Sequence, residues 1–143
     1  MIKAVRHTGI VVRSLEESVE FYCALGFTED NRDIEKGIFI DTVVGLQNTK
    51  LEWVKLKALD GYLLEILQYH SHPEQKSIKK QKSNQLGCSH LAYSVDNINT
   101  ICEKIEKIGG SIVNQPTLTN DKKVKVAYCH DNEGNLMEIV EVL

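Results

Sequence analysis

An internal repeat constrains the fold of this chain more than any other feature of the sequence. Residues 7–27 (HTGIVVRSLEESVEFYCALGF) align without a gap with residues 90–110 (HLAYSVDNINTICEKIEKIGG). Residues 61–69 (GYLLEILQY) match residues 134–142 (GNLMEIVEV) in the same way. Agreement at both ends of each half indicates two copies of one unit. Two copies are too few for a solenoid, so we expect the copies to complete one another's core.

Each copy is predicted to form one strand, one helix and three further strands. The opening strands lie at residues 7–12 and 90–95. Apolar residues then recur at helical spacing, which predicts helices at residues 14–26 and 97–109. The first helix begins with S-x-x-E at residues 14–17, a capping box in which each side chain bonds a backbone N–H of the first turn. The later strands are expected at about residues 36–41, 51–58, 62–69, 111–114, 123–130 and 135–142.

The chain is predicted to be one domain built from two modules. Its 143 residues are enough to bury a core without disulfides or a structural metal. The first module is placed at residues 1–69 and the second at residues 86–143. Residues 70–85 are polar, rich in lysine and contain a proline, so they are the expected linker.

Composition and charge exclude several classes of partner. Apolar residues make up 42% and charged residues 26% of the chain, which is the balance of a globular protein. A net charge of -3 argues against a nucleic-acid partner, because no strongly basic face is implied. No segment resembles a signal peptide or a spanning helix, so we expect no membrane partner and a cytoplasmic location.

The four cysteines give no indication of a disulfide framework. Cys23, Cys88, Cys102 and Cys129 are scattered, with no CxxC pair. They are predicted to be small buried hydrophobic side chains in a reducing compartment. Cys88 stands two residues before His90, so it could instead lie near a functional site.

One histidine and one glutamate stand at matching places in both copies. His7 matches His90, and Glu65 matches Glu138. Their neighbours at alternate strand positions are apolar or small, which predicts faces that resemble a core. An ionised group on such a face needs a compensating partner. Taken singly, each histidine could be hydrogen-bonded in the core and each glutamate could pair with a lysine or arginine. A metal ion shared by all four explains the duplication directly.

The four side chains form a predicted metal site. Two imidazoles and two carboxylates suit zinc, nickel, cobalt, manganese or iron, and the absence of thiolates argues against a closed structural zinc site. Two carboxylates balance a divalent cation, and four ligands on a six-coordinate ion leave two positions for a substrate. Other histidines compete less well: His70 and His72 lack matching carboxylates, while His130 is expected to be exposed beside a turn or at the mouth of the site.

Three segments of the chain resemble the vicinal oxygen chelate superfamily. They are residues 7–27, residues 89–110 and residues 128–141 (YCHDNEGNLMEIVE). This group contains glyoxalase I, methylmalonyl-CoA epimerase, extradiol dioxygenases and the fosfomycin and bleomycin resistance proteins. The resemblance implies an α+β fold in which two βαβββ modules form a half-open, curled mixed sheet around a metal site. It also favours a homodimer.

The ligand set narrows the activity that the resemblance implies. The order His-Glu-His-Glu, on His7, Glu65, His90 and Glu138, resembles glyoxalase I. Epimerases of the methylmalonyl-CoA type have glutamine at the place of Glu65, and dioxygenases use two histidines and one glutamate. The resemblance therefore implies a lyase or isomerase that moves a proton next to a carbonyl through a metal-bound enediolate or enolate.

In this hypothesis, Glu138 or Glu65 is the catalytic base, and the substrate is a small molecule with two neighbouring oxygens. The cofactor is a divalent metal ion, namely zinc, nickel, cobalt or manganese. One alternative is an epimerase acting on a CoA thioester or a sugar-like ketone. Another is a non-catalytic binding protein of the resistance type, which would sequester its ligand.

Overall fold

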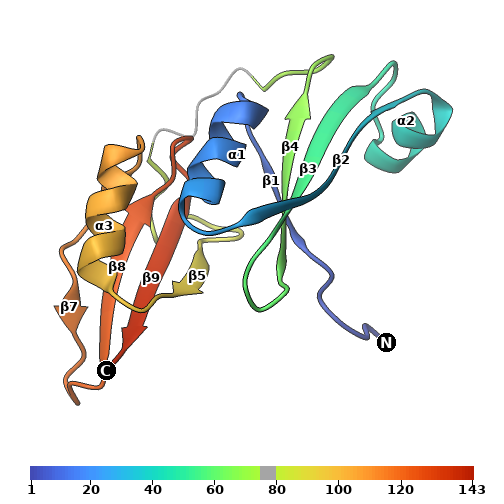
Figure 1. Cartoon of the computed structure of the whole chain (residues 1–143). Helices are drawn as coiled ribbons and strands as arrows, with labels where there is room; N and C mark the ends of the chain where they lie inside the picture. Colours follow the sequence, from blue (N-terminus) through green and yellow to red (C-terminus); the bar gives the residue numbers. More distant parts are fainter. Residues whose placement is uncertain (75–79) are drawn as a thin grey trace. The chain divides into compact units, whose positions relative to one another are not determined.

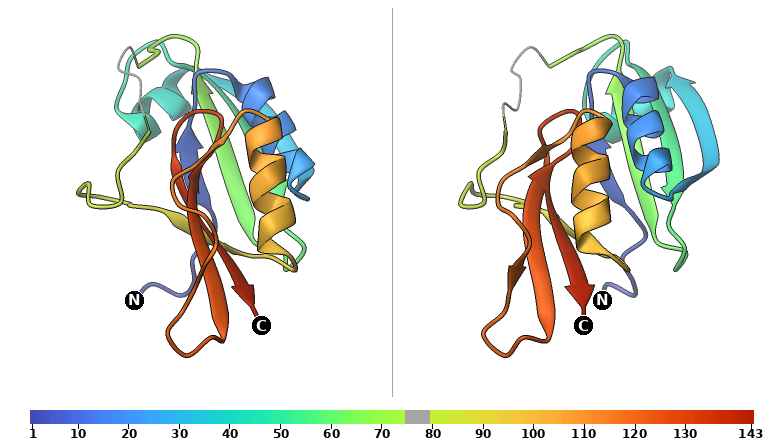
Figure 2. Two further views of the ribbon diagram at one scale, coloured as in Figure 1. Left: turned by 90° about the vertical axis from the view of Figure 1, so that its left-hand side faces the viewer. Right: turned by 60° about the vertical axis from the view of Figure 1, so that its left-hand side comes forward.

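A computed structural model of the chain describes residues 1–74 and 80–143, and it divides into two compact units. Unit 1 is Met1–Ser77 and unit 2 is Ile78–Leu143. The expected linker at residues 70–85 spans this division, and its residues 75–79 lie outside the described part. In each unit a helix lies along the unit's own sheet (Figure 1, Figure 2). No helix in the described ranges has the length and apolar character needed to cross a membrane.

Unit 1 is an open, mixed four-stranded sheet with a helix on one face. Its elements are β1 (Thr8–Val11), α1 (Leu15–Ala24), β2 (Thr28–Lys36), α2 (Ile38–Val44), β3 (Lys50–Lys57) and β4 (Leu63–Tyr69). The strand order is β1-β4-β3-β2, in which β1 runs parallel to β4 and the other neighbours are antiparallel. Helix α1 contacts β3 and β4, and Leu64 and Ile66 of β4 are fully buried.

Unit 2 repeats this topology with small additions. Its elements are β5 (Leu91–Ser94), α3 (Ile98–Lys107), β6 (Ser111–Ile112), β7 (Thr117–Leu118), β8 (Val124–His130) and β9 (Leu136–Val142). The order is β5-β9-β8-β6, with β5 parallel to β9 and β7 paired to β8. The prediction of an α+β fold with two βαβββ modules is confirmed. The sequence did not predict β7 in unit 2 or α2 in unit 1.

The prediction of a strand at residues 36–41 is wrong. Strand β2 ends and α2 begins within this range, because Gly37 turns the chain there with a φ of 94°. The carboxylate of Asp41 then accepts the backbone N–H groups of Asn48 and Thr49, at 2.9 and 2.7 Å. These bonds hold the loop that leads into β3, and they lower the pKa of Asp41. A short apolar run suits a strand as well as a helix, so the local pattern could not decide.

The capping box predicted for the first helix does not form. Ser14 is the N-cap residue of α1, but its side chain makes no capping hydrogen bond. The first N–H of the helix, on Leu15, instead donates to Oε1 of Gln68 on β4, at 2.9 Å. The start of α1 is therefore fixed by the last strand of its unit.

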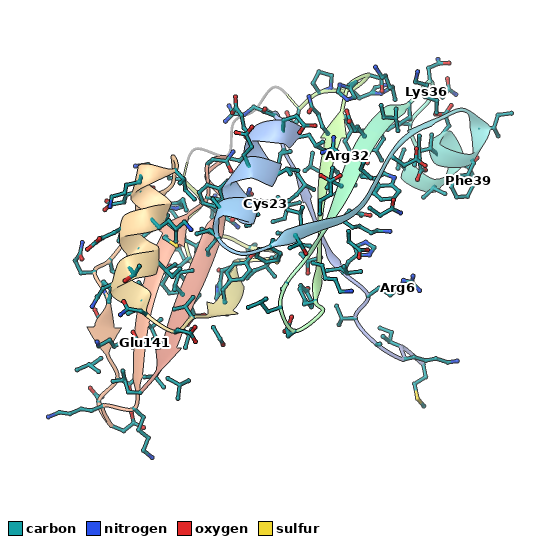
Figure 3. All side chains as sticks on the ribbon, in the orientation of Figure 1. Arg6, Cys23, Arg32, Lys36, Phe39 and Glu141 are labelled. Carbon is teal, nitrogen blue, oxygen red and sulfur yellow. The ribbon has the colours of Figure 1, made fainter. Side chains whose placement is uncertain are left out.

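The second helix is fixed in the same way, in addition to a side-chain cap. The side chain of Asn97, its N-cap residue, accepts the N–H of Thr100 at 3.0 Å. The N–H of Ile98 donates to Oε2 of Glu141 on β9, at 2.9 Å (Glu141 is labelled in Figure 3). Gln68 and Glu141 stand at matching places in the repeat, so this contact is shared by both units.

The hairpins that precede the two glutamate strands differ in strength. Gly61 and Gly134 both have positive φ, at 89° and 97°, a backbone conformation that glycine adopts readily in tight turns. In the first turn, Asp60 accepts one backbone N–H through Oδ1, at 2.9 Å. In the second, Oδ1 of Asp131 accepts the N–H groups of residues 133–135 at 2.8 to 2.9 Å. Asp131 is also buried, with 3% of its surface exposed.

The prediction of buried cysteines is only partly confirmed. All four are free thiols; Cys102 and Cys129 are buried, Cys23 is half-buried and Cys88 is exposed. Burial raises the pKa of the Cys129 thiol to about 12, so this side chain behaves as an inert apolar group. The prediction is wrong for Cys88, which lies in an irregular segment before β5 where no core covers it.

Candidate metal centre

In unit 1, His7 and Glu65 lie side by side. The parallel register of β1 and β4 places Glu65 beside Gly9, two residues after His7. The two side chains contact each other, with 3.2 Å between His7 Nε2 and Glu65 Oε2. The side chain of Glu65 is 14% exposed and that of His7 is 33% exposed, so solvent reaches the pair.

The pair projects from the face of the sheet that α1 does not cover. Leu64 and Ile66 are completely buried, and Gln68 on the same face reaches the start of α1. Because side chains alternate along a strand, Glu65 points to the opposite face together with Leu67. The residues there are half-buried, so the sequence-based prediction of a core-like face is too strong.

Unit 2 contains the same pair in the same register. Glu138 on β9 stands beside Ala92 of β5, two residues after His90. His90 Nε2 lies 2.9 Å from Glu138 Oε2. These side chains are 28% and 22% exposed. Each unit therefore brings together the histidine and the glutamate that the sequence assigned to it.

In unit 1 a lysine joins the pair. Lys55 on β3 stands directly opposite Glu65, and its Nζ is 3.7 Å from Glu65 Oε1. The same Nζ lies 4.5 Å from the centre of the Trp53 ring. The indole is fixed in turn, because Trp53 Nε1 donates to Oε1 of Glu35 at 2.8 Å. Glu65 thus contacts both a histidine and a lysine. The alternative partner that the sequence allows for a strand glutamate, a lysine, is therefore present in unit 1.

In unit 2 a tyrosine takes the place of that lysine. Tyr128 on β8 stands opposite Glu138, and its ring meets the His90 ring edge-on at 5.1 Å. Burial, and then the negative charge of Glu138, raise the pKa of Tyr128. The neighbour of Glu138 is therefore an uncharged hydroxyl rather than an ammonium group.

Ser89 fixes the proton on the His90 ring. Its hydroxyl donates to the Ser83 carbonyl at 3.0 Å, so its oxygen accepts the Nδ1–H of His90 at 3.2 Å. A neutral His90 then has its lone pair on Nε2, which faces a carboxylate oxygen of Glu138 at 2.9 Å. Two acceptors this close repel each other unless a proton or a cation lies between them. A neutral imidazole nitrogen beside a carboxylate is a donor set that fits a divalent cation.

Each unit supplies one such pair. In residues 1–74 and 80–143, no group of three or more His, Cys, Asp or Glu side chains is placed to hold a metal ion. Among these residues, each unit supplies two of the four predicted ligands. Imidazole and carboxylate donors together suit zinc, nickel, cobalt or manganese.

The other candidate histidines are used differently. His70 Nε2 lies 2.8 Å from Glu52 Oε2, a carboxylate partner that the sequence analysis did not identify. His72 contacts the hydroxyl of Ser71 through Nδ1, at 2.8 Å. His70 and His72 thus bind separate partners and do not act together as an HxH pair.

The expectation that His130 is exposed is wrong. Its side chain is buried, with 6% exposed. Nε2–H donates to the carbonyl of Gln81 at 2.9 Å, and Nδ1 accepts the hydroxyl of Ser111 at 3.2 Å. His130 is therefore a hydrogen-bonded residue of the unit 2 interior.

Gln81 is a site-forming residue that the sequence analysis missed. Its backbone N–H donates to the carbonyl of Gly134 at 2.9 Å. Its side chain accepts the N–H of Leu136 at 3.2 Å and donates to the carbonyl of Cys88 at 2.9 Å. The bonds to Gly134 and Leu136 tie the chain that leads to the second histidine onto β9 and its turn, and the bond from His130 ties it to β8. No motif in the expected linker indicated this role.

Comparisons with known proteins agree with this architecture. The family model of the Glyoxalase/Bleomycin resistance protein/Dioxygenase superfamily matches residues 4–139. A protein of Synechocystis sp. described as a probable lactoylglutathione lyase is 27% identical over 141 residues, which cover 94% of this chain and 92% of that protein.

Solved structures share the fold at lower identity. A glyoxalase family protein from Bacillus cereus matches with a TM-score of 0.92 and 22% identity, covering 100% of this chain and 96% of that one. The fosfomycin resistance protein FosX from Listeria monocytogenes, in a complex with Mn(II) and a dihydroxypropylphosphonic acid, matches with a TM-score of 0.65 and 15% identity. That match covers 97% of this chain and 90% of FosX.

Proposed function

Because the chain belongs to the glyoxalase/bleomycin resistance protein/dioxygenase superfamily, we propose that it is a metal-dependent lyase or isomerase of the glyoxalase type. In this proposal, His7, Glu65, His90 and Glu138 hold one divalent cation. The observation that carries it is the duplicated contact between a histidine nitrogen and a carboxylate oxygen, at 3.2 and 2.9 Å. The FosX structure of the same fold is a complex with Mn(II), which supports a metal in this proposal. Zinc, nickel, cobalt and manganese all suit the donors.

The four side chains have separate tasks in the proposed site. The two carboxylates balance the charge of the cation, and the imidazoles bind it in their neutral form. Ser89 keeps the proton of His90 on Nδ1, so that Nε2 stays available. When bound, the cation supplies Lewis-acid polarisation of a substrate carbonyl.

We assign Glu138 as the base that removes a proton from the carbon next to this carbonyl. Among the described residues, its ion pair with His90 uses only Oε2. Glu65 is engaged on both oxygens, with His7 on Oε2 and Lys55 on Oε1. An oxygen that is not held by a neighbour can accept the proton and return it without breaking another contact. Glu65 is the second candidate for this role.

The place to which the proton returns decides the reaction. Return to the neighbouring carbon converts a thiohemiacetal into a thioester, which is a lyase-type isomerisation. Return to the opposite face of the same carbon is an epimerisation. The Synechocystis relative supports the first outcome. The thiol in this reaction is glutathione or a simpler thiol.

The test is proton exchange in heavy water. Metal-loaded protein is mixed with methylglyoxal and either glutathione or a simple thiol, and thioester formation and deuterium uptake are followed by NMR. We expect Glu138→Gln to lower both by about a hundredfold or more, since a positioned base contributes that much. Glu103→Gln, the same change on the exposed surface of α3, should have no effect.

Three results would contradict parts of the proposal. Exchange that is unchanged in Glu138→Gln would refute the assigned base. Exchange of a chiral ketone or CoA thioester without thioester formation would favour an epimerase. Ligand binding that is equally tight after metal removal, with no exchange, would identify a binding protein without turnover.

A further inference from the structure

Lys55 is a charged neighbour of the paired ligands to which the proposed function assigns no contact with the substrate. It stands in the middle of β3, and only 27% of its side chain is exposed. Its ammonium group is held between the carboxylate of Glu65, at 3.7 Å, and the ring of Trp53, at 4.5 Å. A lysine that packs its stem on an indole beside a carboxylate is a cation with a defined position.

Metal binding by Glu65 would change the balance of charge around Lys55. The two carboxylates of the proposed site offset the two positive charges of the cation. The ammonium of Lys55 then adds a positive charge beside the cation. Once Glu65 binds the metal ion, it is a weaker counter-ion for Lys55. The metal ion and the Lys55 ammonium also repel each other at short range. Both effects are larger in a half-buried site than on an exposed surface, because water screens them less.

We propose that Lys55 binds an anionic group of the substrate, a carboxylate or phosphoryl group next to the two vicinal oxygens. This inference rests on the proposed function and names its substrate class. An ammonium with three donors can bind either anion as a point charge. Tyr128 stands at the matching place in unit 2 and is uncharged, so of these two positions it is Lys55 that offers an anion a positive charge.

Trp53 makes the behaviour of Lys55 measurable. It is the only tryptophan in the chain, so intrinsic fluorescence reports this position alone. Its ring contacts the Lys55 ammonium and its Nε1 bonds Glu35. Movement of Lys55 from Glu65 to a bound anion therefore changes the emission of one defined side chain.

The experiment uses three probes with one chelating head and different tails. Acetohydroxamate is neutral beyond its chelating oxygens, malonic acid monohydroxamate adds a carboxylate, and phosphonoacetohydroxamate adds a phosphonate. Each is titrated into the zinc-loaded full chain by calorimetry and by Trp53 fluorescence. The proteins are wild type, Lys55→Met, Lys55→Arg and, as a matched control, Lys57→Met, which removes an ammonium two residues along the same strand.

We expect wild type to bind at least one anionic probe about tenfold or more tightly than acetohydroxamate, as a charged hydrogen bond predicts. Lys55→Met should lose this preference, while Lys55→Arg and Lys57→Met should keep it. Lys55→Met should also bind zinc more tightly than wild type. The anionic probe that binds more tightly shows whether the substrate carries a carboxylate or a phosphoryl group.

The outcomes separate this inference from the proposed function. An anionic preference that persists in Lys55→Met, or a neutral probe that binds as tightly as both anionic ones, would overturn the role of Lys55 alone. Failure of acetohydroxamate to bind zinc-loaded wild type would overturn the proposed function, and the inference with it. Weaker zinc binding by Lys55→Met would contradict the predicted repulsion.

Discussion

The two units place the same histidine and glutamate in the same strand register but surround them differently. In unit 1 the residue opposite the glutamate is Lys55, which contributes a positive charge. In unit 2 it is Tyr128, which contributes a ring and a hydroxyl group. The histidine and glutamate are thus the residues that the two units share, and the residue opposite the glutamate differs in charge.

The largest expected difference between the units concerns their hairpins. Asp131→Ala should lower the free energy of unfolding by about 3 kcal/mol, because several N–H groups lose a buried carboxylate acceptor. Asp60→Ala removes one bond in an exposed turn and should cost about 1 kcal/mol or less. Urea unfolding of both variants measures this contrast, and equal losses would show that the two turns are equivalent in strength.

A smaller difference is expected in how the two histidines are oriented. Ser89→Ala removes the partner of His90 Nδ1 and should weaken zinc binding about tenfold, as loss of an outer hydrogen bond does at metal sites. The residue before His7 is the exposed Arg6 (labelled in Figure 3), and Arg6→Ala should leave the affinity within about twofold. Calorimetric titration with zinc compares the variants. Similar affinities for both would contradict the role of Ser89.

The smallest expected effects concern the hydrogen bonds at the starts of α1 and α3. Gln68→Ala and Glu141→Ala should each cost about 1 kcal/mol of unfolding free energy, because each removes the acceptor of a first-turn N–H. Glu141→Gln keeps the hydrogen bond and loses only a negative charge near the positive end of α3, so it should cost about half as much. Thermal unfolding is the measurement. A Glu141→Gln variant as unstable as Glu141→Ala would show that charge, and not the bond, fixes α3.

Much of the fold was predictable because its signals are local. The two main helices show helical periodicity, and the strands around the hairpins follow clear turn residues. The α2 segment was mispredicted because a short apolar run does not distinguish a helix from a strand. The contacts of Gln68 and Glu141 with the helix starts were missed for a different reason: Gln68 is 53 residues from Leu15, and Glu141 is 43 residues from Ile98.

For the candidate site, the contact between histidine and glutamate within each unit was predictable. The repeat identified both His–Glu pairs, and the structure brings each pair into contact within its unit. Lys55 could have been found, because counting outward from the Asp60 turn places it opposite Glu65. The burial of His130 could not have been predicted, because its partner Gln81 lies 49 residues away in a segment without a recognisable pattern.

The most direct test of the central claim is the number of divalent ions bound per chain. Zinc stoichiometry and affinity are measured by elemental analysis and calorimetry for wild type and for His7→Gln and His90→Gln, each of which breaks one pair. If the two pairs share one ion, wild type binds one per chain, and either substitution lowers the affinity at least about a hundredfold. Two ions per chain, or one ion that survives the loss of either histidine, would contradict a shared metal.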